Sequence, residues 1–262
     1  MYLFVDTEAN GIPLDPDAFA ADVENWPRLV QIAWSLTDKD CNELRTQVFI
    51  IRPEGFEIPA RIERSRGITT ETALSLGADI RAVLKAFAKD LTDADALVAH
   101  NVSHDERLVR SEFYRAGRRM NPFVGKRLYC TMRSATGLCK LAGGPRGYKW
   151  PTLEELHQFL FNTGFESPHD AAADVRACVR CFKELKRHGT IGDQDLFEEI
   201  YRLADSCEWF HTSQFVDSVY SQFEERGFIT MPQRDALNGI RQMLLRNGGG
   251  KAVSARAVYA VK

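Results

Sequence analysis

The apolar and polar positions along the chain begin with strand patterns. Residues 2–5 form a short apolar, β-prone run, which is typical of a strand buried on both faces. The sequence Asn-Gly-Ile-Pro at 10–13 ends this run, and a loop or short helix rich in Asp and Ala follows to about residue 26. Over 30–36, large apolar residues alternate with smaller or polar ones, and a further strand pattern covers 47–51. We expect these three strands to form a meander.

From residue 79 the apolar spacing becomes helical. One helical face contains Ile80, Val83, Leu84, Phe87 and Leu91. Residues 96–99 then indicate a short buried strand, which leads into a helix that starts near residue 103 and ends at Gly117. We expect one more strand over 128–131.

The rest of the chain is predicted to be mostly helical. A loop containing Gly and Pro precedes a helix capped by Thr152. The order of elements predicts an α/β unit followed by a small all-helical unit. The predicted segments are a main domain over 1–188 that ends in a helix at 170–186, a linker at 189–194, a helical domain over 195–247 with helices at 196–207, 212–226 and 232–246, and a basic tail at 248–262.

Composition limits the classes of function. A net charge of −2 argues against a non-catalytic protein that coats nucleic acid, because such proteins rely on neutralising phosphates. It does not argue against an enzyme whose metal ions supply positive charge locally. The chain has no apolar run near the roughly 20 residues that cross a bilayer, and its first residues do not resemble a signal peptide. We therefore expect a cytoplasmic protein that does not bind membranes.

The six cysteines fit this location, because they are scattered along a chain too long to depend on disulfides. Cys178 and Cys181 have the spacing of a zinc half-site, but no second pair follows at ligand spacing. We therefore expect no zinc site there.

Three separate carboxylates have positions that suggest chemistry. Asp6 and Glu8 follow the first strand with one residue between them, so in an extended chain both project from the same face. Solvated turn residues are the alternative explanation. Asp105 falls in the first turn of its helix, on or beside the core-facing side. It is either a residue that favours the helix dipole or part of a site at the end of the sheet.

The third group is His169 and Asp174. Their separation of five residues is not same-face helical spacing, so we interpret Asp174 as fixed on the helix and His169 as mobile on the preceding loop. A surface histidine that caps the helix is the alternative. Four carboxylates at one sheet edge would repel each other and retain protons, whereas two Mg²⁺ or Mn²⁺ ions would remove that cost and assist phosphoryl displacement. A nearby histidine can accept the proton of the attacking water.

These residues occur in recognisable motifs. The run Phe-Val-Asp-Thr-Glu at 4–8 resembles the first exonuclease motif of the DnaQ-like superfamily with a DEDDh catalytic set. Residues 98–105 look like its second motif, and residues 169–174 are similar to its third. Gly-Ile-Thr at 67–69 also matches the superfamily, although Arg66 precedes it where a histidine is often found. The resemblance covers about residues 1–188.

The resemblance implies a ribonuclease-H-like fold with a mixed sheet flanked by helices, and 3′-to-5′ hydrolysis that releases nucleoside 5′-monophosphates. It implies two Mg²⁺ or Mn²⁺ ions and His169 as the general base. The implied metal ligands are Asp6, Glu8, Asp105 and Asp174. Thr7, His100 and Asn101 would lie near the terminal nucleotide. The segment 10–26 is longer than a minimal member needs, so the entrance to the site is not predicted.

The nucleic acid is not fixed by these motifs. The C-terminal helices favour DNA with single-stranded or frayed ends, in proofreading, repair or end trimming. Two helices around a Gly turn can bind DNA, and the same helices are a candidate surface for a polymerase or repair protein. RNA trimming is the alternative within the superfamily, and a binding scaffold on an inactive fold is the alternative class, against which all five catalytic residues are present. Five aromatic residues indicate a small core rather than a surface that stacks on bases: Trp209, Phe210, Phe215, Tyr220 and Phe223.

Overall fold

The fold comes from a computed structural model of the 262-residue chain. It describes residues 1–117, 121–144, 147–166, 170–205, 214–226 and 229–247. The chain divides into two units, one made of Met1–Met132 with Pro151–Glu184 and the other of Arg133–Trp150 with Leu185–Lys262. Within the described ranges, no helix is both long enough and apolar enough to span a membrane.

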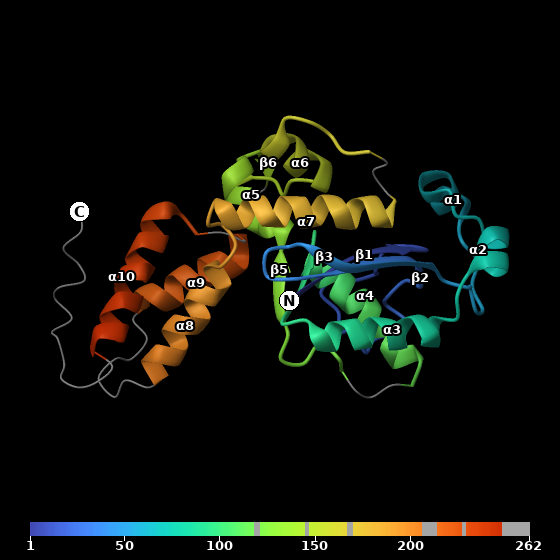
Figure 1. Cartoon of the computed structure of the whole chain (residues 1–262), viewed down its shortest axis with the longest axis horizontal. Helices are drawn as coiled ribbons and strands as arrows, with labels where there is room; N and C mark the ends of the chain where they lie inside the picture. The colour runs from blue at the N-terminus through green and yellow to red at the C-terminus, as the bar shows by residue number, and fades with distance from the viewer. Residues whose placement is uncertain (118–120, 145–146, 167–169, 206–213, 227–228, 248–262) are drawn as a thin grey trace. The chain divides into compact units, whose positions relative to one another are not determined.

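A mixed five-stranded sheet forms the centre of the first unit (Figure 1). Its strands are β1 (Tyr2–Ala9), β2 (Leu29–Thr37), β3 (Glu43–Ile50), β4 (Ala96–Ala99) and β5 (Arg127–Cys130). Their order is β3-β2-β1-β4-β5, with β2 antiparallel to both β1 and β3. Strand β4 is parallel to both β1 and β5. The predicted meander and the mixed sheet are therefore confirmed.

Helices α3 (Ile80–Asp93) and α4 (Val102–Arg115) cover one face of the sheet (Figure 1). The odd-numbered residues Leu3 and Val5 of β1 are fully buried there in one cluster with Phe87 of α3. The predicted helix begins where its sequence indicates, because the carboxylate of Asp79 accepts the N–H of Ala82 at 3.0 Å.

Helix α7 (Ala171–Arg187) lies along the opposite face (Figure 1). The ring of Phe182 packs edge-on against the rings of Tyr2 and Phe4, with centroids 5.0 and 5.3 Å apart. Because both faces are covered, all nine residues of β2 are buried. The alternating pattern over 30–36 therefore correctly predicted a strand, but its smaller and polar residues are buried too.

The first unit contains three further helices, of which the sequence predicted one. The capping box of Thr152 and Glu155 starts α6 (Leu153–Phe161), as expected. Two short helices, α1 (Ala60–Arg66) and α2 (Thr70–Leu76), were not predicted. They flank a small apolar cluster that contains Val30, Ile58, Ile68 and Ala73.

The second unit contains the C-terminal helices. These are α8 (Asp193–Asp205), α9 (Gln214–Arg226) and α10 (Met231–Asn247). They share one apolar core, against which Phe215, Tyr220 and Phe223 pack, so these three aromatic residues belong to a core as predicted. Trp209, Phe210 and the basic tail lie outside the described residues. The unit also holds most of the unpredicted helix α5 (Thr131–Cys139) and a small hairpin of β6 (Ala142–Gly144) and β7 (Gly147–Tyr148).

Candidate active site

Strand β1 carries two of the predicted acids within its length. The strand does not end before Asp6, as its apolar run suggested, because Asp6 pairs with Ala33 of β2 and Glu8 pairs with Gln31. Both even-numbered residues project from the face covered by α7, two and four positions beyond Phe4. The backbone ladder therefore holds both carboxylates on a rigid element in the middle of the sheet.

Helix α7 brings the third acid to them. Asp170 starts the helix by accepting the N–H of Ala173 at 2.9 Å, and the small side chains of Ala171 and Ala173 are buried at its first turn. One oxygen each from Asp6, Glu8 and Asp174 lie within 4.8 Å of one another. Three residues from distant parts of the sequence thus form an acidic centre.

Asp105 lies beside this centre in the first turn of α4. It is only 4% exposed, and the hydroxyl of Thr7 donates to its Oδ1 at 2.7 Å. Burial, assisted by the charge of Glu8, raises the pKa of Asp105 to about 7, although the hydrogen bond from Thr7 opposes the shift. Asp105 thus lies beside the other three acids near the end of β1, and the role of the four as metal ligands stays a prediction.

The donor set of these residues fits hard divalent cations. Carboxylate oxygens are the ligands that such ions prefer, and among the residues that the structure describes no softer ligand joins the three acids. Burial, assisted by the charge of Glu8, disfavours the ionised form of Asp105. A divalent ion held by these acids would favour that ionised form.

His100 connects three segments of the first unit. Its Nε2 lies 2.9 Å from the carbonyl oxygen of Pro151, and its Nδ1 lies 3.0 Å from the hydroxyl of Thr131. A carbonyl only accepts, so Nε2 carries the proton and Nδ1 accepts from Thr131. Burial lowers the pKa of His100 to about 4, which keeps the ring neutral. The described contacts of His100 are thus with protein groups, and its predicted place near the terminal nucleotide stays a prediction.

The other predicted substrate residues have different surroundings. Thr7 is buried with its hydroxyl on Asp105, so in this structure it positions an acid. Asn101 starts α4 in the left-handed conformation, with φ 82°, and accepts a hydrogen bond from Ser103. His169 lies outside the described residues, and its role as the base stays a prediction.

The sequence analysis did not predict that the thiol of Cys178 is influenced by the charges of the acids. From the sequence, this residue was considered only as part of a zinc half-site that has no second pair, yet its thiol lies 3.8 Å from the hydroxyl of Thr131 and is buried. Burial raises the pKa of the thiol, and the charges of Asp6 and Asp105 add to the effect. The signal was present in the sequence, because Cys178 is four residues after Asp174 and so shares its helical face.

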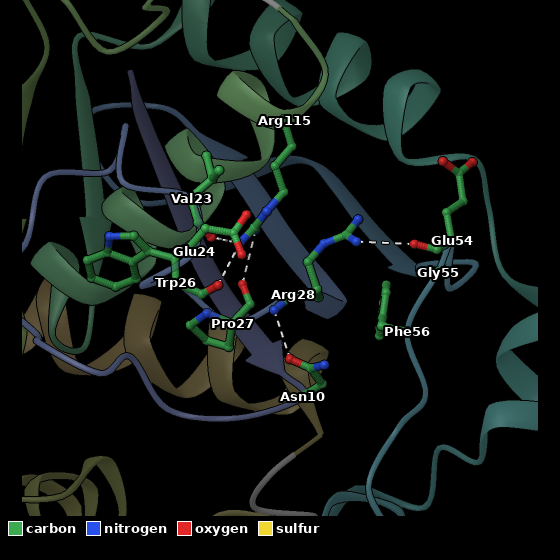
Figure 2. Close-up of a pocket in the computed structure, with 10 residues that line it drawn as sticks. All are labelled: Asn10, Val23, Glu24, Trp26, Pro27, Arg28, Glu54, Gly55, Phe56 and Arg115. Carbon is green, nitrogen blue, oxygen red and sulfur yellow. Dashed lines mark hydrogen bonds between the residues drawn. The ribbon is translucent and has the colours of Figure 1, made fainter.

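A second polar network lies where the loop after β1 meets α4. The buried carboxylate of Glu112 accepts from Nε of Arg28 at 2.9 Å, from Nη1 of Arg115 at 2.8 Å and from the backbone N–H of Leu29 at 3.1 Å. A pocket of about 570 Å³ lies beside these arginines, and none of the four acids lines it. Figure 2 shows the residues that line this pocket. Its lining residues are Asn10, Val23, Glu24, Trp26, Pro27, Arg28, Glu54, Gly55, Phe56 and Arg115.

Comparison with solved structures shows the same fold. A crystal structure of E. coli exonuclease I in complex with a dT13 oligonucleotide has 22% sequence identity and a TM-score of 0.56, over 78% of this chain and 44% of that one. The zinc-ion-bound form of an E. coli exonuclease I–ssDNA complex has 23% identity and a TM-score of 0.57, over 78% and 43%. The chain thus spans less than half the length of these relatives. The likeness confirms the predicted ribonuclease-H-like fold.

No curated protein matches the chain. The model of the RNase_T family, described as Exonuclease, matches residues 3–182, and this range includes all four acids and His169. The resemblance to the DnaQ-like superfamily of 3′-5′ exonucleases is therefore confirmed, and with it the expectation of an enzyme. The chain belongs to the RNase_T family of exonucleases.

Proposed function

We propose that the protein removes nucleotides from the 3′ end of DNA, at single-stranded or frayed ends, and releases nucleoside 5′-monophosphates. One observation carries this proposal: carboxylate oxygens of Asp6, Glu8 and Asp174 converge within 4.8 Å in a member of an exonuclease family. The fold likeness to an exonuclease solved with dT13 supports a single DNA strand as the substrate.

The family depends on divalent metal ions, and we propose two Mg²⁺ or Mn²⁺ ions held by Asp6, Glu8, Asp105 and Asp174. When bound, these ions supply the charge that favours attack by water and departure of the 3′ oxygen. The protein's own part is rigidity. Strand β1 fixes Asp6 and Glu8, and Thr7 orients the carboxylate of Asp105.

His169 is the proposed general base, because it precedes Asp174 by five residues in the sequence, as in the third motif of the superfamily. A neutral imidazole there accepts the proton of the attacking water. We further propose that residues 1–188 form the catalytic domain and that Asn101 contacts the terminal nucleotide. Residues 195–247 would then contact a polymerase or repair protein, and the basic tail would contact phosphates.

Degradation of 5′-labelled oligonucleotides tests the proposal. We expect purified protein with Mg²⁺ to shorten a DNA strand from its 3′ end, and Asp6→Asn to abolish this shortening. Asp93→Asn is the matched control, because Asp93 is an exposed acid near the end of α3. Undiminished degradation by Asp6→Asn, or in excess chelator, would contradict the proposed mechanism.

Two further comparisons refine the test. A matched RNA strand separates the DNA exonuclease from the RNA-trimming alternative, because faster release of ribonucleotides would reverse the proposed preference. His169→Ala should lower turnover much more than binding of a single strand. A loss of binding alone would show that His169 is not the base.

A further inference from the structure

The loop between β1 and β2 exposes apolar side chains next to the acid-bearing strand. Ile12, Leu14 and Phe19 are 81, 85 and 86% exposed, the highest values among the large apolar residues that the structure describes. All three fall within eight residues of each other. Exposed apolar groups gathered in one segment indicate a binding surface, whereas single ones need no explanation.

Hydrogen bonds across its base give this loop a fixed shape. The side-chain oxygen of Asn25 accepts the N–H of Asp15 at 2.7 Å, and its amide nitrogen donates to the carbonyl of Asp15 at 2.9 Å. The N–H of Leu14 also donates to the carbonyl of Asn25 at 3.1 Å. These bonds join the two sides of the loop, so Leu14 is held outward by an ordered backbone.

Arginines of α4 attach the loop to the core. Arg115 donates to the carbonyl groups of Val23, Trp26 and Pro27, and Figure 2 shows its guanidinium pointing toward these carbonyls. Arg107 donates to the carbonyl of Pro16. The orientation of the loop is therefore set by the same helix that carries Asp105.

The contacts of Trp26 link Phe19 to the first turn of α4, the turn that carries Asp105. The indole N–H of Trp26 donates to the carbonyl of Phe19 at 3.2 Å. Its ring centroid lies 6.1 Å from that of His104, which immediately precedes Asp105. At its other end, the loop begins two residues after Glu8. The apolar segment is thus attached to β1 and to α4, the two elements that carry Asp6, Glu8 and Asp105.

We propose that this loop binds the unpaired bases of the strand being degraded, with Phe19 stacked on a base and Leu14 packed against its neighbour. The inference rests on the proposed function, because it assigns the partner of a surface next to the proposed cleavage site. The acids, with their proposed metal ions, act on the phosphate group of the strand. The bases are flat and largely apolar, so they require a different kind of contact. Stacking on an aromatic ring accepts every base, as an exonuclease of mixed sequences requires. In a duplex the neighbouring pairs cover the base faces, so the loop also favours single strands.

Abasic oligonucleotides provide the test. Protein variants are compared on a normal DNA strand and on one whose 3′-terminal segment lacks bases, by cleavage kinetics and by fluorescence anisotropy of binding. On the normal strand, we expect Phe19→Ala to raise Kd and KM about tenfold with little change in kcat. On the abasic strand, Phe19→Ala should match the wild type. Phe19→Trp should restore binding, and Val124→Ala, which alters an exposed residue outside the loop, should have no effect.

Each contrary outcome is distinct. An equal loss for Phe19→Ala on both strands, or no loss on either, would overturn base stacking. Concentration-dependent self-association that Phe19→Ala abolishes would identify a second copy of the chain as the partner instead. Binding that depends on bases and on Phe19, without any cleavage by the wild type, would contradict the proposed function but support this inference. Because Phe19 is exposed, the variant should unfold at the wild-type temperature, which circular dichroism checks.

Discussion

Two buried aspartates of this protein should respond in opposite ways to the same substitution. Asp105 receives the hydroxyl of Thr7 and lies beside the charge of Glu8, and its pKa of about 7 is roughly 3 units above the usual 3.8. One unit is equivalent to about 1.4 kcal/mol. Relative to the unfolded chain, the ionised carboxylate of Asp105 therefore destabilises the metal-free folded protein by on the order of 4 kcal/mol at pH 8.

The raised pKa of Asp105 determines whether the free energy of unfolding rises or falls with pH. Between about pH 4 and pH 7 the folded protein binds a proton that the unfolded chain releases, so the stability present below pH 4 is lost as the pH rises through 7. Asp105→Asn keeps the shape and an acceptor for Thr7 but has no charge. We expect this variant to exceed the wild type by about 2–4 kcal/mol in free energy of unfolding at pH 8 in chelator, and to lose that advantage near pH 4.

Asp90→Asn is the matched control. Asp90 of α3 is as deeply buried, but it accepts from the indole of Trp34 at 2.8 Å, from Nε of Arg45 at 3.1 Å and from the amide of Gln47 at 3.3 Å. Asp90→Asn leaves these three donors without a charged acceptor. The free energy of unfolding should therefore fall by about 2–3 kcal/mol. Urea unfolding followed by tryptophan fluorescence measures both variants. A metal-free Asp105→Asn protein less stable than the wild type at pH 8 would refute the reasoning.

Three further predictions concern the metal, His100 and Glu112. Mn²⁺ should raise the unfolding temperature of the wild type because it binds only the folded site, and calorimetry should show no such rise for Glu8→Gln. Because the pKa of His100 is lowered to about 4, its contribution to stability is present above pH 6.5 and is lost as the pH falls towards 4. The wild type should therefore lose about 3 kcal/mol more than His100→Gln over that interval, and equal slopes in urea titrations would contradict the assignment. Glu112→Ala leaves Arg28 and Arg115 without their shared carboxylate and should lower the free energy of unfolding by about 3–5 kcal/mol. A decrease below 1 kcal/mol would show that water replaces the carboxylate as the acceptor.

The sequence predicted those features whose pattern is local and long. The 14-residue helix α3 shows its apolar period over nearly four turns, and Asp79 marks its start. Asp105 could be placed at the core-facing side because Leu108 and Val109 define that side. The one-residue spacing of Asp6 and Glu8 fixed their common face once a strand was assumed.

Other features depend on contacts that no local pattern contains. Helices α1 and α2 have seven residues each, too few turns for a period to emerge. The extension of β1 through Asp6 and Glu8 results from pairing with β2, which overrides the low strand preference of acids. The course of the loop at 10–28 is set by Arg115, almost 90 residues later, so the entrance to the site was not predictable.

Strand β1 and helix α7 meet at two places, the acidic centre and the ring contacts of Phe182 with Tyr2 and Phe4. Along the strand, Tyr2 and Phe4 precede Asp6 and Glu8 on the same face, and along the helix Asp174 precedes Phe182 by eight residues. Eight helical residues rise about 12 Å, and four strand residues span about 13 Å. The pairing of Phe182 with Phe4 and that of Asp174 with the acids therefore require the same register. Aromatic packing at one end of β1 consequently fixes the acids at the other, against the repulsion that would separate them.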